Sequence, residues 1–308
     1  MSGLALPPAV LDFAARGADW AAYVDRLPRL VGELLDEWAL VQDGELLHGH
    51  GSLVVPVTHG GDRAVLKIAF PDVETEHEAL ALQTWAGRGA VRMLRADPRR
   101  RALLLERLHA ADLRTVGDLE ACEVVAGLYA SLHVPAPARL RSFTDYLGTW
   151  TEPLAALPRD APIPHRLVDQ ALSLFRELSG DPASTGTLLH HDLHYENVLA
   201  ADRTPWLAID PQPLSGDPHA EPAPMLWNRW DELGSWGEGV RAGVRWRFHT
   251  LVDVAGLDEE RARDWVVVRM VVNAYWSIED ATRADRRLLP SEREWITRCI
   301  AIAKAVQD

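Results

Sequence analysis

The spacing of apolar residues changes along the chain, and this change constrains the fold more than any other feature. Residues 46–47, 52–58 and 64–69 are short β-rich runs separated by glycine-containing turns, which predicts an antiparallel meander of three strands. Residues 103–105 predict one further buried strand. In the last hundred residues, apolar positions recur with a helical period, most clearly over 259–283. The pattern predicts an α+β protein with a small mixed part first and a large, mostly helical part after it.

Helices are also predicted around these strands. Apolar residues at helical spacing over 18–38 predict two short helices divided by Pro28. The other predicted elements are helices over 73–86, 119–133 and 165–178, an irregular proline-rich connection between the last two, and a strand, loop and strand over 187–189, 190–205 and 206–210.

Composition excludes several classes of protein. The chain has 308 residues, 47% of them hydrophobic, which is too apolar for a disordered chain. Its 32 Lys and Arg against 45 Asp and Glu give a net charge of −13, which disfavours nucleic acids and anionic membranes as partners. Two cysteines allow no disulfide framework, and no apolar run reaches the ~18 residues of a membrane span. We therefore expect a cytoplasmic protein.

Three polar residues follow or end apolar runs in the second half of the chain. Asp192 and Asn197 are spaced as Asp-x-x-x-x-Asn, and Asp210 ends the next apolar run. A phosphoryl donor with Mg²⁺ needs oxygen ligands for the cation and a carboxylate at the attacking hydroxyl. Asn197 and Asp210 can supply the ligands, and Asp192 can orient or deprotonate the acceptor.

Lys67 lies in the middle of a predicted strand, among apolar neighbours. A lysine at such a position is costly unless its ammonium group reaches an anion or solvent. Glu78 shares a predicted helix face with Leu82 and Trp85, so its carboxylate is expected to point inward and pair with Lys67. Glu74 and Glu76 are the alternative partners, Glu76 being the first substitute, and a solvated strand edge is the alternative role for Lys67.

Taken in chain order, these residues resemble the kinase-like phosphotransferases, and more closely the aminoglycoside phosphotransferase family. Within that family, Asp19-Trp20, Leu27-Pro28, Asp36-Glu37-Trp38 and the run 206–211 resemble the streptomycin 6-phosphotransferase and hydroxyurea phosphotransferase branch. The resemblance implies a bilobal protein-kinase-like fold. Its N-terminal lobe, residues 1–105, would hold a helical cap and an antiparallel sheet that covers the nucleotide. Its helical C-terminal lobe, residues 106–308, would hold the catalytic loop and the acceptor site.

The resemblance also implies ATP and Mg²⁺ as cofactors, with GTP left open, and a role for each motif residue. Asp192 would be the catalytic base or orienter, Asn197 and Asp210 would bind magnesium, and Lys67, paired with Glu78, would contact the α- and β-phosphates. The remaining implied nucleotide contacts are a covering loop with Gly49, Gly51 and Ser52, and backbone groups from Glu106 to Leu108 beside the adenine. A plain hairpin turn is an equally good interpretation of residues 49–52, because a lone Gly-x-Gly is weak evidence.

The acceptor is expected near a locally acidic stretch, where the resemblance places its site. Between residues 210 and 238, Arg229 is the single Lys or Arg, and beside Asp210 the acidic residues are Asp217, Glu221, Asp231, Glu232 and Glu238. Such carboxylates would attract a polycationic sugar, although a solvated acidic loop gives the same pattern. Glu279 and Asp280 are further candidates for the acceptor site.

The sequence therefore predicts an ATP- and Mg²⁺-dependent phosphotransferase acting on a hydroxyl of an aminoglycoside such as streptomycin, in antibiotic resistance. Its partner would be a small cationic molecule; the sequence leaves the oligomeric state open. Three alternatives stand: a kinase of hydroxyurea or another small hydroxylated metabolite, a catalytically idle nucleotide-binding protein, and a zinc hydrolase built on His190, His191 and His194.

Overall fold

The computed structural model describes residues 4–234 and 239–307. The chain forms two compact units: a sheet unit, which runs to His109 and includes Ala201–Arg203, and a helical unit with Ala110–Ala200 and the residues from Thr204 onward. The sheet unit extends past residue 105 because the Arg107 guanidinium donates to the carbonyls of Ala64 and Val57. It includes the distant segment Ala201–Arg203 because Arg203 binds the carboxylate of Glu106.

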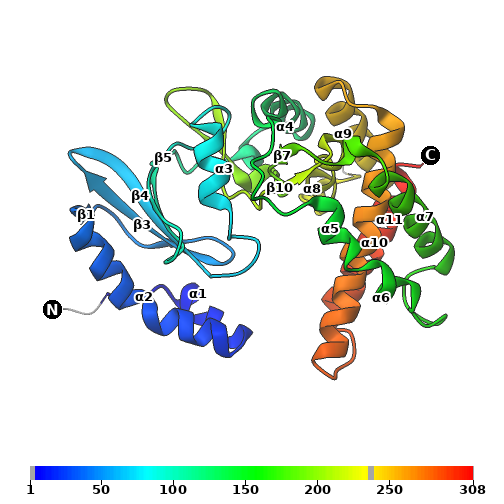
Figure 1. The fold of residues 1–308 in the computed structure, drawn as a ribbon, viewed down its shortest axis with the longest axis horizontal. Coiled ribbons are helices and arrows are strands. Elements are labelled where there is room, and N and C mark those ends of the chain that lie inside the picture. The colour runs from blue at the N-terminus through cyan, green and yellow to red at the C-terminus, as the bar shows by residue number, and fades with distance from the viewer. Residues whose placement is uncertain (1–3, 235–238, 308) are drawn as a thin grey trace. The chain divides into compact units, whose positions relative to one another are not determined.

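The sheet unit combines one antiparallel sheet with helices (Figure 1). Its helices are α1 (Pro8–Leu11), the 3-10 helix η1 (Asp12–Arg16), α2 (Ala18–Glu37) and α3 (Glu78–Trp85). Its strands are β1 (Leu40–Gln42), β2 (Leu47–His48), β3 (Ser52–His59), β4 (Asp62–Ala69), β5 (Met93–Asp97) and β6 (Ala102–Glu106).

The six strands are ordered β1-β3-β4-β6-β5, and β2 also pairs with β3. The predicted meander is present as β2, β3 and β4, which pair antiparallel in sequence order. The predicted strand at residues 103–105 lies in β6, which pairs with β4 so that Leu103 is opposite Lys67. Sequence analysis missed β1, a strand of only three residues, and β5, the edge strand that pairs with β6.

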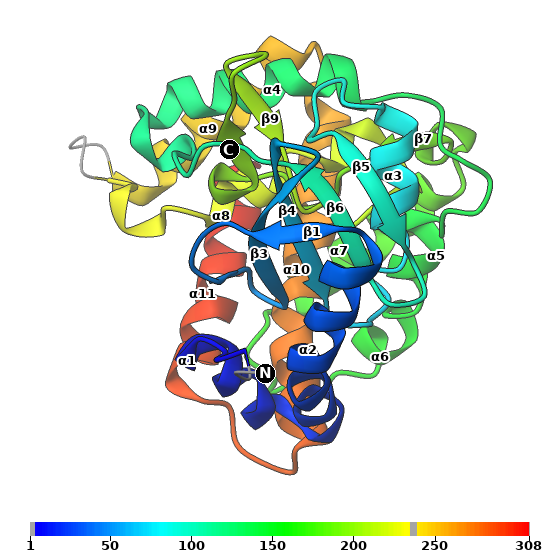
Figure 2. The ribbon, with the colours of Figure 1, turned by 90° about the vertical axis from the view of Figure 1, so that its left-hand side faces the viewer.

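Helix α2 covers one face of this sheet (Figure 2). Its buried residues Tyr23, Leu27 and Leu34 pack in one apolar cluster with alternate residues of the strands, among them Leu66 and Ile68 of β4. The prediction of two short helices was wrong, because α2 continues through Pro28. A proline removes one backbone hydrogen bond from a helix interior, and the burial of this apolar face keeps the two halves continuous.

Helix α3 begins later than predicted, at Glu78 rather than near residue 73. The carboxylate of Asp72 accepts hydrogen bonds from the amides of Glu74 and Thr75, which holds these residues in a turn. Glu78, Leu82 and Trp85 are nevertheless all buried, as their shared helix face predicts.

The helical unit contains most of the helices. They are α4 (Asp118–Leu132), α5 (Phe143–Gly148), α6 (Thr151–Ala155), α7 (His165–Ser179), α8 (Ala223–Trp227), α9 (Gly239–Ala255), α10 (Glu259–Arg283) and α11 (Pro290–Ala305). Its 3-10 helices are η2 (Leu113–Thr115), η3 (Pro182–Ser184), η4 (Tyr195–Asn197), η5 (Pro218–Ala220) and η6 (Trp230–Glu232). Its short strands are β7 (Thr187–Leu189), β8 (Val198–Ala200), β9 (Trp206–Ala208) and β10 (Leu214–Gly216).

Helix α10 forms the centre of this unit and packs against α7 and α11 (Figure 1). The predicted strand at 187–189 exists as β7, and the one predicted over 206–210 exists as the shorter β9. They do not pair with each other: β7 pairs with β10, and β9 with β8. The connection predicted as irregular contains α5 and α6, which are too short to give a clear helical period.

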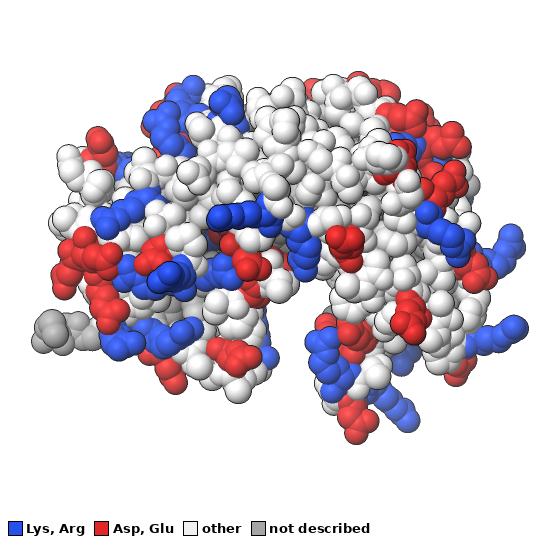
Figure 3. Space-filling view, in the orientation of Figure 1, with Lys and Arg blue, Asp and Glu red and all other residues white. Residues whose placement is uncertain are grey.

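Within the described residues, no helix has the length and apolar character needed to cross a membrane. On the face seen in Figure 3, basic and acidic side chains lie next to one another on both units.

Candidate active site

Lys67 and Glu78 form a buried ion pair in the sheet unit. The Lys67 Nζ atom lies 2.6 Å from Glu78 Oε1, and the two residues are 6% and 3% exposed. Because side chains alternate along a strand, Lys67 faces away from the α2 side, where Leu66 and Ile68 are buried. Glu74 and Glu76, the alternative partners, are exposed. The pair fixes the ammonium group of Lys67 on the sheet face opposite α2.

Residues 49–51 form a short turn between β2 and β3. The Gly49 amide donates to the Ser52 carbonyl over 3.0 Å, and the Gly51 carbonyl accepts from the Phe70 amide over 2.8 Å. A Cβ atom at Gly51 would lie 3.1 Å from the Trp20 ring, so this position favours glycine. Ser52 is buried at the start of β3. The geometry is that of a hairpin turn braced by Trp20, and its contact with a nucleotide stays a prediction.

The carboxylate of Glu106 is engaged inside the sheet unit. It accepts hydrogen bonds from the Arg203 guanidinium, the shortest over 2.7 Å, and from the Arg92 amide over 2.7 Å. Partial burial opposes its ionisation, but these hydrogen bonds outweigh burial and lower the pKa of Glu106. Leu108 is half-buried. The side chain of Glu106 is therefore structural. The predicted contact of the backbone of residues 106–108 with a nucleotide stays a prediction.

In the helical unit, β7 leads into a loop whose first residue, His190, is bonded on three sides. The His190 amide donates to Glu221 Oε1 over 2.5 Å, and its carbonyl accepts from the Gln212 amide over 3.0 Å. Its Nε2 atom lies 2.9 Å from the Ile209 carbonyl, which can only accept, so Nε2 carries the proton. His190 thus ties the loop before Asp192 to the segment before Asp210.

Asp192 follows a strained residue and is oriented by two amide side chains. His191 has a φ of 69°, an uncommon conformation for a residue other than glycine. Asn197 Nδ2 donates to the Asp192 carbonyl over 2.8 Å and to its Oδ2 atom over 3.3 Å, and Gln212 Nε2 lies 3.4 Å from the same oxygen. The Asp192 side chain is 26% exposed, so its carboxylate is both oriented and accessible.

The segments of Asn197 and Asp210 are joined directly. The Ile209 amide donates to the Asn197 carbonyl over 2.9 Å, and β8 and β9 pair on either side of this contact. Asp210 has a φ of 57°, so the chain turns sharply where the carboxylate is presented. The structure therefore brings the segments of Asp192, Asn197 and Asp210 together in one set of contacts.

The family model for aminoglycoside/hydroxyurea antibiotic resistance kinases matches residues 37–281. The chain belongs to this family.

Two curated relatives and one solved structure illustrate the similarity. A streptomycin 6-kinase from Streptomyces glaucescens is 46% identical over 278 residues, covering 88% of this chain and 89% of the relative. A hydroxyurea phosphotransferase from Kitasatospora aureofaciens is 42% identical over 276 residues, covering 86% and 77%. The crystal structure of a choline kinase from Streptococcus pneumoniae has a TM-score of 0.63 at 12% identity, covering 91% of this chain and 99% of that one. The predicted family and the predicted fold, an antiparallel sheet followed by a mostly helical region, are both confirmed.

Two of the carboxylates predicted at the acceptor site of this kinase are buried instead. Glu221 is 1% exposed and accepts the amides of His190 and His191. Burial raises its pKa to about 7, although the two amides act in the opposite direction. The expectation of a surface carboxylate is corrected here, because Glu221 supplies acceptors that the loop amides cannot find within the loop.

Asp217 is likewise buried, with 1% of its surface exposed. It accepts from Trp265 Nε1 over 2.7 Å and Arg261 Nε over 2.5 Å, and it contacts His219 Nδ1 over 2.6 Å. Burial opposes ionisation, but these hydrogen bonds outweigh it and lower the pKa of Asp217. Asp217 therefore holds η5 against α10 and is not an acceptor-facing group.

The other predicted acceptor carboxylates lie at the surface of the kinase. Asp231 and Glu232 are exposed, and Glu232 accepts from Arg229 Nε over 2.8 Å. Glu279 accepts from Arg283 over 2.8 Å, and Asp280 is exposed. Glu238 lies outside the described residues. A contact of these four residues with the acceptor stays a prediction.

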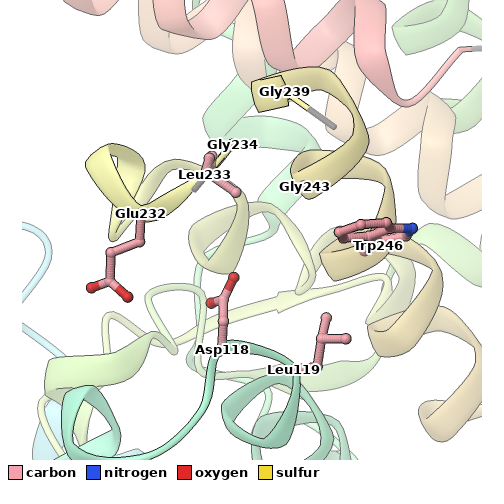
Figure 4. A pocket seen from close by; sticks show the side chains of 8 residues that line it. All are labelled: Asp118, Leu119, Glu232, Leu233, Gly234, Gly239, Gly243 and Trp246. Carbon is pink, nitrogen blue, oxygen red and sulfur yellow. The ribbon is translucent and has the colours of Figure 1, made fainter. Parts of the chain in front are cut away.

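Glu232 also lines a small pocket together with Asp118, next to α4 and α9 (Figure 4). Asp118 accepts from the Tyr195 hydroxyl, in the loop after Asp192, and from Arg247 Nε over 2.8 Å. Arg247 is fully buried. Sequence analysis missed this brace, because its three members are far apart in the chain and no periodic pattern links them.

The histidines of the loop around Asp192 have separate partners. The Arg269 guanidinium donates to His191 Nε2, and burial together with this cation lowers the pKa of His191 well below its usual value. His194 lies 3.7 Å from Asp192, and burial lowers its pKa as well. In residues 4–234 and 239–307, no three His, Cys, Asp or Glu side chains are grouped to hold a metal ion. The zinc-hydrolase alternative has no geometric support.

Proposed function

We propose that this kinase transfers the γ-phosphoryl group of ATP, with Mg²⁺, to a hydroxyl of streptomycin or a closely related aminoglycoside. The observation that carries the proposal is the fixed and accessible carboxylate of Asp192. Its loop is tied to Glu221 and Ile209, and its Oδ2 atom is oriented by Asn197 and Gln212.

Asp192 is the catalytic base in this proposal. The acceptor oxygen forms a bond to the γ-phosphorus, the bond from that phosphorus to the bridging oxygen of ADP breaks, and Asp192 takes the hydroxyl proton. Its carboxylate suits this role because it is 26% exposed and held by amide donors. The neighbouring His194 stays neutral at pH 7, because burial lowers its pKa, so Asp192 is not neutralised by that side chain.

Asn197 and Asp210 would hold Mg²⁺, and their donor atoms fit it. Magnesium prefers carboxylate and amide oxygens. The Asn197 amide nitrogen donates to Asp192, so its oxygen, Oδ1, is the atom able to bind a cation. When bound, Mg²⁺ neutralises negative charge on the phosphates of the donor.

Lys67 would contact the donor phosphates. A buried ammonium group fixed by Glu78 has lost the conformational freedom of a surface lysine, so it can present its charge with little further ordering. Glu78 therefore acts as a positioning residue for Lys67.

Streptomycin is favoured over hydroxyurea as the acceptor on chemical grounds. The two curated relatives differ little in identity, 46% and 42%, so identity does not decide between them. Asp231 and Asp280 place exposed carboxylates on the helical unit, beside Glu232 and the half-buried Glu279, which are paired with arginines. They suit a polycationic sugar, whereas uncharged hydroxyurea needs no such groups.

The test is Mg²⁺-dependent ADP formation from ATP with streptomycin, other aminoglycosides, spectinomycin, choline and hydroxyurea as separate acceptors. The proposal expects stimulation by streptomycin and a phosphorylated product, with GTP in a parallel series to define the donor. Stimulation by hydroxyurea alone would establish the alternative acceptor. If the protein binds ATP but forms no ADP with any of these acceptors, the proposal is contradicted.

A further inference from the structure

A hollow of about 210 Å³ lies within the sheet unit, between α2, the end of β4 and the turn that joins β5 to β6. Tyr23, Leu30 and Ile68 contribute apolar surface to it. Glu33 is the one acidic residue of its lining. Five arginines from two separate segments also line it: Arg26, Arg29, Arg99, Arg100 and Arg101. In a chain with a net charge of −13, this concentration of positive charge is unusual.

The hollow is separate from the proposed nucleotide contacts. Ile68 belongs to the buried cluster under α2, and the preceding residue, Lys67, points to the opposite face of the sheet. The hollow therefore opens on the α2 side, whereas Lys67 and Glu78 lie on the other side.

Two of the five arginines are neutralised by carboxylates. Arg29 lies 3.6 Å from Glu33, and Arg100 binds both Asp97 and Glu37, over 2.6 Å and 2.7 Å. The acidic residue of the lining, Glu33, is thus paired with Arg29, and Arg100 is paired with two carboxylates outside the lining.

The other three arginines have no carboxylate partner among the described residues. Arg101 donates to the carbonyls of Glu76 and Asp72, Arg26 donates to the carbonyl of Ala22, and the exposed side chain of Arg99 makes no such contact. Carbonyl contacts orient a guanidinium group without cancelling its charge. Three positive charges therefore meet at one small hollow, and their mutual repulsion would be relieved by a bound anion.

We propose that this hollow is a binding site for a compact anion that carries two phosphate groups. The planar fork of arginine matches phosphate oxygens, and three uncompensated guanidinium groups match the charge of a diphosphate. The volume is below the ~300 Å³ at which pockets for drug-sized ligands begin, so the ligand is small. The site does not depend on the proposed kinase reaction.

The test is calorimetric titration of the full-length protein at low ionic strength with inorganic pyrophosphate and, in a second arm, fructose 1,6-bisphosphate. Saturable binding should weaken at least about tenfold in the double variant Arg26→Ala/Arg99→Ala, since each lost charge-assisted contact is worth roughly a factor of ten. Arg63→Ala, which removes an exposed arginine of β4 outside the hollow, should bind as the unmodified protein does. Tighter binding of pyrophosphate would identify the ligand as a free diphosphate, and tighter binding of fructose 1,6-bisphosphate would identify it as an organic bisphosphate.

Lys67→Ala separates this site from the nucleotide contacts, because it should retain the anion binding that is lost in Arg26→Ala/Arg99→Ala. The proposal is overturned if the unmodified protein binds neither anion, if the double variant binds as well as Arg63→Ala does, or if Lys67→Ala abolishes binding. ADP formation is not part of this readout, so the outcome is independent of the proposed phosphotransfer.

Discussion

The buried carboxylate of Glu221 should make the protein less stable as the pH rises. Burial raises its pKa from the usual 4.5 to about 7. Between these two values the folded state binds the proton more tightly than the unfolded state does. The free energy of unfolding should therefore be largest below about pH 4.5 and fall as pH rises through about pH 7. At 1.36 kcal/mol per pKa unit, the full change is about 3 kcal/mol.

Glu221→Gln isolates this contribution. The glutamine oxygen can still accept from the His190 and His191 amides, but the side chain cannot ionise. Urea unfolding of both proteins from about pH 5 to about pH 8 measures the effect. The stability of the unmodified protein relative to the variant should decline by about 2 to 3 kcal/mol over that range. A difference that stays constant with pH would refute the reasoning.

Glu221→Ala tests the same side chain as a hydrogen-bond acceptor. It leaves two buried amides unsatisfied, at about 1–3 kcal/mol each, so it should lower stability by about 2–6 kcal/mol. Because these amides precede Asp192, turnover should fall further in Glu221→Ala than in Glu221→Gln. Equal stability and turnover in the two variants would show that the loop does not depend on this acceptor.

Three other substitutions test separate parts of the site. Lys67→Met should raise the KM for ATP or lower kcat by at least about tenfold while the circular dichroism spectrum stays folded; an unfolded variant would make Lys67 structural. Asn197→Ala should raise the Mg²⁺ concentration for half-maximal activity by about tenfold, and an unchanged requirement would remove Asn197 as a ligand. Tyr195→Phe should cost about 1.5–3 kcal/mol in urea unfolding, because its hydroxyl donates to the carboxylate of Asp118; an unchanged midpoint would show that this contact is not stabilising.

The spacing of apolar residues was sufficient to predict the helix that carries Glu78 and the direction of its carboxylate. The spacing of Glu78, Leu82 and Trp85 predicts an inward-facing carboxylate whether the helix begins at residue 73 or at Glu78, since the face is the same. The later start could not be read from periodicity, because it depends on the turn formed by Asp72. Similarly, Pro28 is a helix breaker by local rules, but the burial of α2 against the sheet overrides it.

Charge in the sequence did not reveal which carboxylates are buried. Asp217 and Glu221 stand in the same acidic stretch as Asp231 and Glu232, yet the first two serve as acceptors for Trp265 and for the loop amides. Their partners are brought to them only by the tertiary fold. The same limit applies to Arg247, which reaches Asp118 from another helix.

The central claim is that Asp192 removes the proton from an aminoglycoside hydroxyl during phosphotransfer from ATP. The most direct measurement is streptomycin-dependent ADP formation by the unmodified protein and by Asp192→Asn, together with ATP binding by each. We expect turnover to fall by about 10²- to 10⁴-fold in the variant, the contribution typical of a general base, with ATP binding retained. Turnover unchanged in Asp192→Asn would contradict the account, whatever the identity of the acceptor.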